Sequence, residues 1–282
     1  MFDFRYHALS LAAVFLALLV GLLLGVAVGD RELVSSAREE LEQSLEDDVR
    51  EQRQEAARLR DQLQREERFA GAVYPLLVSG ELEGRRLGLL FLGAADDRVV
   101  GLVRRALDDT GGRLAWAGAV RLPPDLPALA SRAEGTRYER LEADAEDLLE
   151  PFGFRMGAQL VLGGRLAERE RPSLLQTFSG RLGRLDGLIV VRGGAEEGDA
   201  PATLARGIAE GAAASGLPAV GVELTRTEPS NVGWYRDRRL TSVDNLDDVA
   251  GRAALVFALQ GAEGAFGSKG SAQALLPELA AR

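Results

Sequence analysis

The chain has 282 residues and a formal net charge of −9, from 43 acidic and 34 basic side chains, so we expect no nucleic-acid partner. It has no cysteine, two methionines and one histidine. This composition excludes disulfides, thiol catalysis and cysteine metal sites, and we expect no cofactor.

An uncharged run of 22 residues extends from Ala8 to Gly29. As a helix it would measure about 33 Å, which is long enough to cross a bilayer. A cleavable signal peptide has an apolar region of about 7 to 15 residues behind a positive segment, so an uncleaved anchor over residues 1–30 is favoured. Cleavage stays open, because Ala27-Val28-Gly29 has the small-x-small form that signal peptidase reads.

The orientation of this anchor is weakly specified by charge. Arg5 precedes the run and Arg31 and Arg38 follow it, which is too even for the positive-inside rule to decide. Because long downstream domains translocate largely regardless of charge, we expect a cytoplasmic N-terminus and an extracytoplasmic C-terminal domain.

Residues 31–78 are rich in Glu, Arg, Gln and Ala and have no Gly or Pro before Gly71, which predicts one long helix. Gln52 and Glu66 occupy positions where a heptad repeat predicts apolar residues, and Leu41 breaks the repeat. The predicted coiled coil is therefore a weak one. Its apolar seam, at alternating spacings of four and three, consists of Leu45, Val49, Ala56, Leu59 and Leu63.

A glycine ridge precedes this seam on the same predicted helix: Gly21, Gly25 and Gly29 recur at every fourth position. Small residues at this spacing allow helix backbones to approach closely in lipid. Ridge and seam together favour a parallel homodimer. The alternative is that the glycines face lipid and the polar helix is a solvated stalk.

Residues 79–282 alternate short aliphatic runs with helical stretches, which predicts a mostly parallel, Rossmann-like α/β domain. The segment 138–183 is expected to form helical pieces, interrupted at 151–153, 163–164 and 172. We predict strands at 86–92, 114–122, 186–192, 219–224 and 240–243, and helices at 96–109, with Asp96 as its cap, 201–215 and 249–260.

Three blocks carry a resemblance to a known family: RYHALSLAAVFLALLVGLLLG from residue 5, RLGLLFLGAADDRVVGLVRRAL from residue 86 and TSVDNLDDVAGRAALVFALQG from residue 241. They resemble the MctB family, named for copper transport in mycobacteria. The resemblance implies a membrane-anchored envelope protein linked to copper homeostasis. It also implies an alternative, since some relatives are associated with cell separation and with control of peptidoglycan hydrolases through coiled-coil contacts.

The ligand chemistry argues against direct copper binding. Cu(I) prefers Cys or Met and Cu(II) prefers imidazole, whereas this chain offers only Met1, His7 and Met156. We therefore expect no high-affinity copper site. The two hypotheses are an envelope component of copper transport and a dimeric scaffold that regulates another envelope protein.

Two polar motifs follow predicted strands. Asp244, Asn245 and Asp247, with Asp248, are expected to form a strand-to-helix turn in which Asn245 or Asp247 caps the next helix, rather than a hard-cation site. Gly193-Gly194 is expected to be a plain turn, because it lacks a phosphate-loop pattern. No convincing acid/base pair is present, so we expect no enzyme activity.

The last candidate is Trp234, Tyr235 and Arg236, in a predicted loop. Aromatic residues and arginines of this kind are enriched at protein interfaces, so the loop is a candidate surface for an envelope partner. The alternative is a loop packed over the sheet edge, with Trp234 covering apolar surface.

Overall fold

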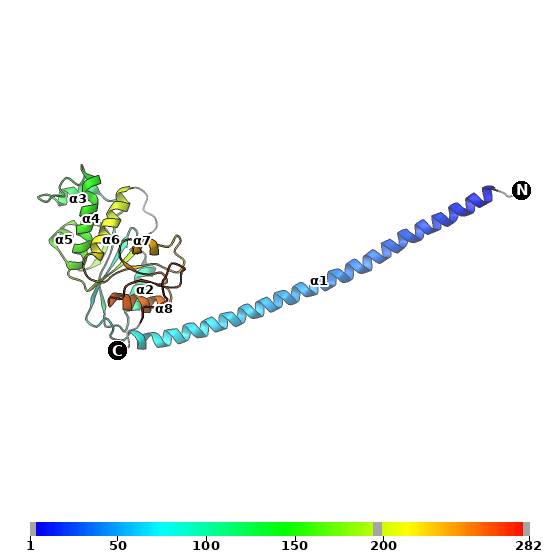
Figure 1. Ribbon diagram of the computed structural model, residues 1–282, viewed down its shortest axis with the longest axis horizontal. Coiled ribbons are helices and arrows are strands. Elements are labelled where there is room, and N and C mark those ends of the chain that lie inside the picture. The colour runs from blue at the N-terminus through cyan, green and yellow to red at the C-terminus, as the bar shows by residue number, and fades with distance from the viewer. Residues whose placement is uncertain (1–3, 194–198, 279–282) are drawn as a thin grey trace. The chain divides into compact units, whose positions relative to one another are not determined.

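The computed structural model describes residues 4–193 and 199–278, leaving aside the side chains of 4–5, 27–40 and 42. The chain divides into two compact units, residues 1–66 and 67–282. The first consists of most of helix α1 (Phe4–Val78), and the second is an α/β unit (Figure 1).

Helix α1 has 75 residues, and its N-terminal part is strongly apolar. Its segment Tyr6–Val26 has a mean hydropathy of 2.8, and among the described residues it is the one stretch long and apolar enough to cross a membrane. Its side chains are exposed in the single chain. The prediction of an N-terminal apolar helix suited to single-pass anchoring is confirmed.

The last turns of α1 belong to the α/β unit. Val78 is fully buried, and the Tyr74 hydroxyl donates a 2.8 Å hydrogen bond to the carbonyl oxygen of Ala106. Pro75 lies within these turns without ending the helix. The helix is thus packed on the unit at its C-terminal end.

The α/β unit is built on one seven-stranded sheet of order β3-β2-β1-β4-β5-β6-β7. All neighbouring strands are parallel except β3, which runs antiparallel to β2 at one edge. The prediction of a mostly parallel sheet is confirmed, while the finer Rossmann-like assignment stays a prediction. The strands are β1 (Arg86–Leu92), β2 (Arg113–Val120), β3 (Leu175–Gly180), β4 (Gly187–Arg192), β5 (Ala219–Val222), β6 (Thr241–Val243) and β7 (Ala265–Phe266).

Helices cover both faces of this sheet, because successive side chains of a strand point to opposite sides. Leu89 and Phe91 of β1 join the core under α2 and α8, whereas Leu90 and Leu92 join the core under α4 and α6. Figure 1 shows these helix pairs on opposite sides of the sheet. The helices of the unit are α2 (Asp97–Leu107), α3 (Leu126–Arg132), α4 (Ala145–Leu162), α5 (Arg165–Leu174), α6 (Asp199–Ala213), α7 (Val232–Arg236) and α8 (Val249–Leu259).

Helices α4 and α6 make the most extensive helix–helix contact, and glycines form it. Gly153 on α4 lies against Gly207 on α6, while Gly157 faces the backbone of Ile208 and Gly211 faces the backbone of Phe154. A Cβ at Gly157 would overlap the carbonyl oxygen of Ile208. The two backbones therefore touch where a side chain would hold them apart.

The structure differs from four expectations about the α/β unit. Helix α4 continues through Pro151–Gly153, and α5 continues through Pro172, because burial of neighbouring side chains such as Phe152 outweighs the local cost of proline. Strand β3 was missed, since its alternation is hidden in a half-exposed edge strand. A further strand, β7, follows 240–243.

The glycine contact predicts opposite effects of one substitution at two helical positions. Gly157→Ala should lower the free energy of unfolding by about 2 kcal/mol, because the methyl group must displace backbone. Gly101→Ala on α2, where the space is open, should raise it by roughly 0.5 to 1 kcal/mol through helix propensity. Urea unfolding of the whole protein in detergent, followed by tryptophan fluorescence, measures both. Equal effects would contradict the close contact.

Candidate functional site at the carboxyl edge of the sheet

Ligands of parallel α/β sheets bind beyond the carboxyl ends of the strands, where the strand order reverses. Here that point lies between β1 and β4, because β2 and β4 flank β1 on opposite sides. Gly193 follows β4, and its N–H donates a 3.1 Å bond to the carbonyl oxygen of Leu92. Gly194, the second glycine of the predicted turn, lies outside the described residues. A cavity of about 190 Å³ opens here, lined by Asp96, Arg192, Glu223 and Thr227 among others.

A buried ion pair borders this cavity. The ammonium group of Lys269 lies 2.7 Å from Oε1 of Glu223, and the two side chains are only 13% and 1% exposed. Lys269 also donates a 2.7 Å bond to the carbonyl oxygen of Thr227. Glu223 accepts two more hydrogen bonds, from the Ser230 hydroxyl at 2.7 Å and from the N–H of Asn231 at 2.6 Å. The pair thus ties the C-terminal segment to the end of β5.

Asp244 makes a similar link from the end of β6. Its carboxylate accepts hydrogen bonds from the backbone N–H groups of Ser268, at 2.8 Å, and Lys269. Burial raises the pKa of Asp244, and these donors oppose the rise. Gly267 has φ +140°, and a Cβ there would overlap this carboxylate, so the position favours glycine on both counts.

The prediction that Asn245 or Asp247 caps helix α8 was wrong. Asp248 takes the N-cap position of α8 and makes no side-chain cap hydrogen bond. Asp247 instead accepts bonds from the N–H and hydroxyl of Thr225, at 2.8 and 2.9 Å. Asn245 is fully buried; its Nδ2 approaches Asp248 at 3.5 Å, and its backbone carbonyl oxygen accepts a 2.9 Å bond from the N–H of Asp248. The side chains of this turn therefore hold neighbouring segments together.

The predicted partner surface is also corrected, because its residues lie on short helix α7 and Tyr235 is fully buried. The Tyr235 hydroxyl donates to the carbonyl oxygen of Val222 at 3.1 Å and accepts from the N–H of Arg192 at 2.9 Å. Trp234 is half-buried, with the guanidinium groups of Arg192 and Arg238 at 5.0 and 4.1 Å from its ring centre. Only Arg236 of the three is exposed.

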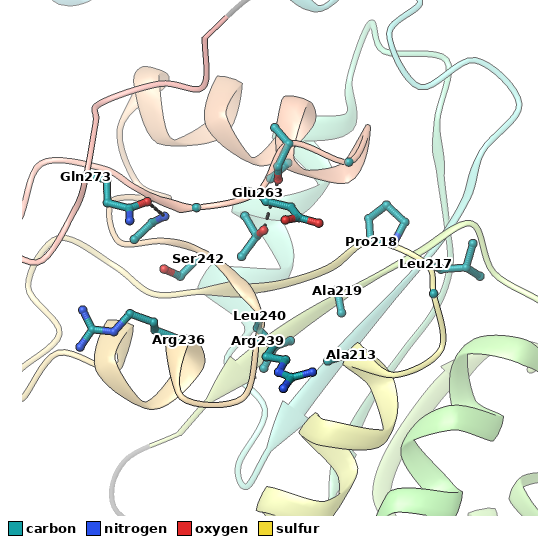
Figure 2. Close-up of a pocket in the computed structure, with 17 residues that line it drawn as sticks. Ala213, Leu217, Pro218, Ala219, Arg236, Arg239, Leu240, Ser242, Glu263 and Gln273 are labelled. Carbon is teal, nitrogen blue, oxygen red and sulfur yellow. Dashed lines mark hydrogen bonds between the residues drawn. The ribbon is translucent and has the colours of Figure 1, made fainter.

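Arg236 lines a different pocket, of about 610 Å³, at the amino ends of β5, β6 and β7 (Figure 2). Gly and Ala make up about half of its lining, and Arg236, Arg239 and Glu263 supply charges of both signs. Thr241 donates to the carbonyl oxygen of Ala262 at 3.2 Å, and Gln273 accepts from the N–H of Ala265 at 3.1 Å. Two arginines against one glutamate leave a small excess of positive charge, which indicates no particular ligand.

The described residues do not fit a conventional copper site. They contain no cluster of three or more His, Cys, Asp or Glu side chains that could hold a metal ion. The thioether of Met156 is fully buried in the apolar core. His7, the single histidine of the sequence, lies on the apolar helix.

Sequence reasoning missed Glu223 and Lys269. One signal could have found them: Lys269 is the sole lysine of the chain, and Glu223 directly follows a buried strand. The pairing itself joins residues 46 positions apart, which no local pattern indicates.

The predicted helix–helix contacts on α1 are uncovered in the single chain. Gly21 and Gly25 have no neighbouring atom within 4 Å, and the surroundings of Gly29 lie outside the described residues. Ala56 is half-buried by its own helix. The other seam residues are 55%, 44%, 54% and 58% exposed at Leu45, Val49, Leu59 and Leu63.

Comparison with known proteins gives matches along nearly the whole chain. A family model described as "Copper transport outer membrane protein, MctB" matches residues 1–150 and 155–277. Proteins named copper transporter MctB from Mycobacterium bovis and Mycobacterium tuberculosis are 25% identical to it over 299 aligned positions, which cover 92% of this chain and 92% of each relative.

The buried pair predicts a strongly asymmetric response to substitution. Lys269→Met should lower the free energy of unfolding by about 3 kcal/mol, because it leaves the Glu223 carboxylate buried without its cation. Glu223→Gln combined with Lys269→Met should recover much of that loss, since no buried charge remains. Urea unfolding compares the two. A single variant as stable as the double variant would contradict the role of the pair.

Proposed function

The chain belongs to the MctB family, and from this premise we propose that it acts in copper transport or copper homeostasis as a membrane-anchored protein of the cell envelope. The observation that carries the proposal is the extent of the family match. It includes the apolar part of α1 and almost all of the α/β unit, so the chain shares the whole organisation of the family rather than one domain.

The proposed topology is a single pass with the N-terminus in the cytoplasm and the α/β unit outside. It is supported by the one apolar stretch, Tyr6–Val26, found among the described residues. Helix α1 continues unbroken beyond this stretch to Val78. An uncleaved anchor of this kind would keep the α/β unit tethered to the membrane.

We propose that copper is handled without a high-affinity site on the single chain and without catalysis. The few possible soft or imidazole donors lie far apart in the sequence, and Met156 is buried. The polar side chains at the carboxyl edge are bound by partners from the same chain. A single apolar helix cannot form a pore, so any passage for copper would require several copies or another protein.

The proposed assembly is a parallel homodimer through α1. The exposed seam residues lie at spacings of four and three, as in a coiled coil, and the open glycines at 21 and 25 would allow close approach in lipid. A second copy of the chain presents the same two surfaces in the same order. It is therefore a simple partner that would cover both.

A deletion strain of the source organism tests the proposed role. Loss of the gene should reduce growth in copper-supplemented medium while cell separation remains normal under the microscope. Re-expression of the wild-type gene should restore growth, and so should Met156→Leu, which removes the one internal thioether. Normal copper tolerance with defective cell separation would contradict the proposal and favour regulation of a peptidoglycan hydrolase.

A further inference from the structure

A second charged feature lies beside α4 and α5 of the α/β unit, and the sequence alone did not indicate it. It is a hollow of about 830 Å³ between α4, the start of α5 and the segment 136–138. We call it the arginine hollow, after its four lining arginines; no carboxylate residue lines it. In a chain with a net charge of −9, average composition does not account for such a concentration of positive charge. The four are Arg137, Arg155, Arg165 and Arg169.

The positive charge of the hollow is largely uncompensated. Within the described part of the chain, Arg137, Arg155 and Arg165 make no ion pair; only Arg169 has a carboxylate nearby, that of Glu170, at 3.6 Å. Glu170 is fully buried and has no hydrogen-bond partner among the described residues. Burial raises its pKa to about 7, so that near neutral pH it is only partly ionised.

The frame that carries the arginines is held by buried contacts. Tyr138 is buried, and its hydroxyl accepts a 2.8 Å bond from Arg137 and donates a 3.2 Å bond to the carbonyl oxygen of Pro151 on α4. Gln159 on α4 accepts a 3.1 Å bond from the N–H of Ala167 on α5. These bonds join the three elements, so the hollow is formed before any ligand arrives.

The start of α5 adds to the positive charge of the hollow. Gly164 occupies its N-cap position and offers no side-chain acceptor, and the first residues of the helix, Arg165 and Leu166, line the hollow. Gln159 accepts from the N–H of Ala167 in this first turn, and the N–H groups at a helix N-terminus carry partial positive charge. This contribution reinforces that of the guanidinium groups on three separate elements.

We propose that the arginine hollow binds a phosphate-bearing ligand. The planar guanidinium group can donate two parallel hydrogen bonds to phosphate oxygens. Several guanidinium groups without an ion pair suit a ligand with several negative charges. The hollow has the volume of a small-molecule site. It attracts anions and so cannot be a site for free copper cations. The inference is independent of the proposed copper role.

Titration calorimetry on the whole protein in uncharged detergent tests the proposal, with sodium tripolyphosphate as the probe in buffer free of divalent cations. The wild type should bind the probe, more weakly as salt rises from 50 to 200 mM. Arg155→Gln with Arg165→Gln should weaken binding at least tenfold. The matched control, Arg104→Gln with Arg105→Gln on α2, removes the same charge elsewhere on the surface and should change the affinity less than twofold.

A second titration identifies the source of the phosphate. Dihexanoyl phosphatidylglycerol, used below its critical micelle concentration, presents a lipid headgroup. Binding of this lipid alone with the same arginine dependence would assign the hollow to a headgroup, and binding of tripolyphosphate would support a soluble phosphate compound. Binding of neither probe, or equal losses in the two double variants, would overturn the proposal. Equal displacement of the probe by a hexaglutamate peptide would also overturn it, in favour of an acidic polypeptide.

Discussion

Apolar side chains on a helix require something to cover them, and most of α1 finds no such cover within its own chain. Residues 1–66 form a unit separate from the α/β unit, and the leucines and valines whose side chains are described along it are exposed. Because helices in proteins gain most of their stability from packing of an apolar face, the stability of this length of helix depends on what surrounds it. A bilayer suits Tyr6–Val26, and a second helix suits the seam that follows. The proposals on anchoring and dimerisation both rest on this constraint.

In the α/β unit, by contrast, the apolar side chains of the core are covered by other parts of the same chain. Its sheet is covered on both faces, the backbones of α4 and α6 touch at glycines, and the acidic groups at the carboxyl edge bind backbone or side-chain donors of the same chain. The arginine hollow carries more charge than the other two cavities described above, and it is separate from the residues that hold the edge of the sheet together.

The sequence predicted those features that depend on local patterns. Strand 86–92 has the predicted bounds, and Asp96 caps α2 by accepting a bond from the N–H of Arg98, because an apolar run and a capping residue are signals within a few positions. Glycines at every fourth position were singled out at 21–29, whereas the glycine contact found in the structure joins α4 and α6. The link from Asp247 to Thr225 and the ion pair at Glu223 arise only when distant segments meet. The turns that follow the strands could therefore be predicted from the sequence, whereas the contacts between them could not.

The mass of the whole protein in detergent, measured by light scattering with the detergent contribution subtracted, tests the central claim that α1 pairs with a second copy. The account predicts twice the chain mass of 30.2 kDa. It predicts a single-chain mass when Leu45, Val49, Leu59 and Leu63 are changed to serine together with leucine at Gly21 and Gly25. Serine at four exposed positions off the seam, Gln54, Ala57, Arg58 and Asp61, should leave the double mass unchanged. A single-chain mass for the wild type would contradict the account.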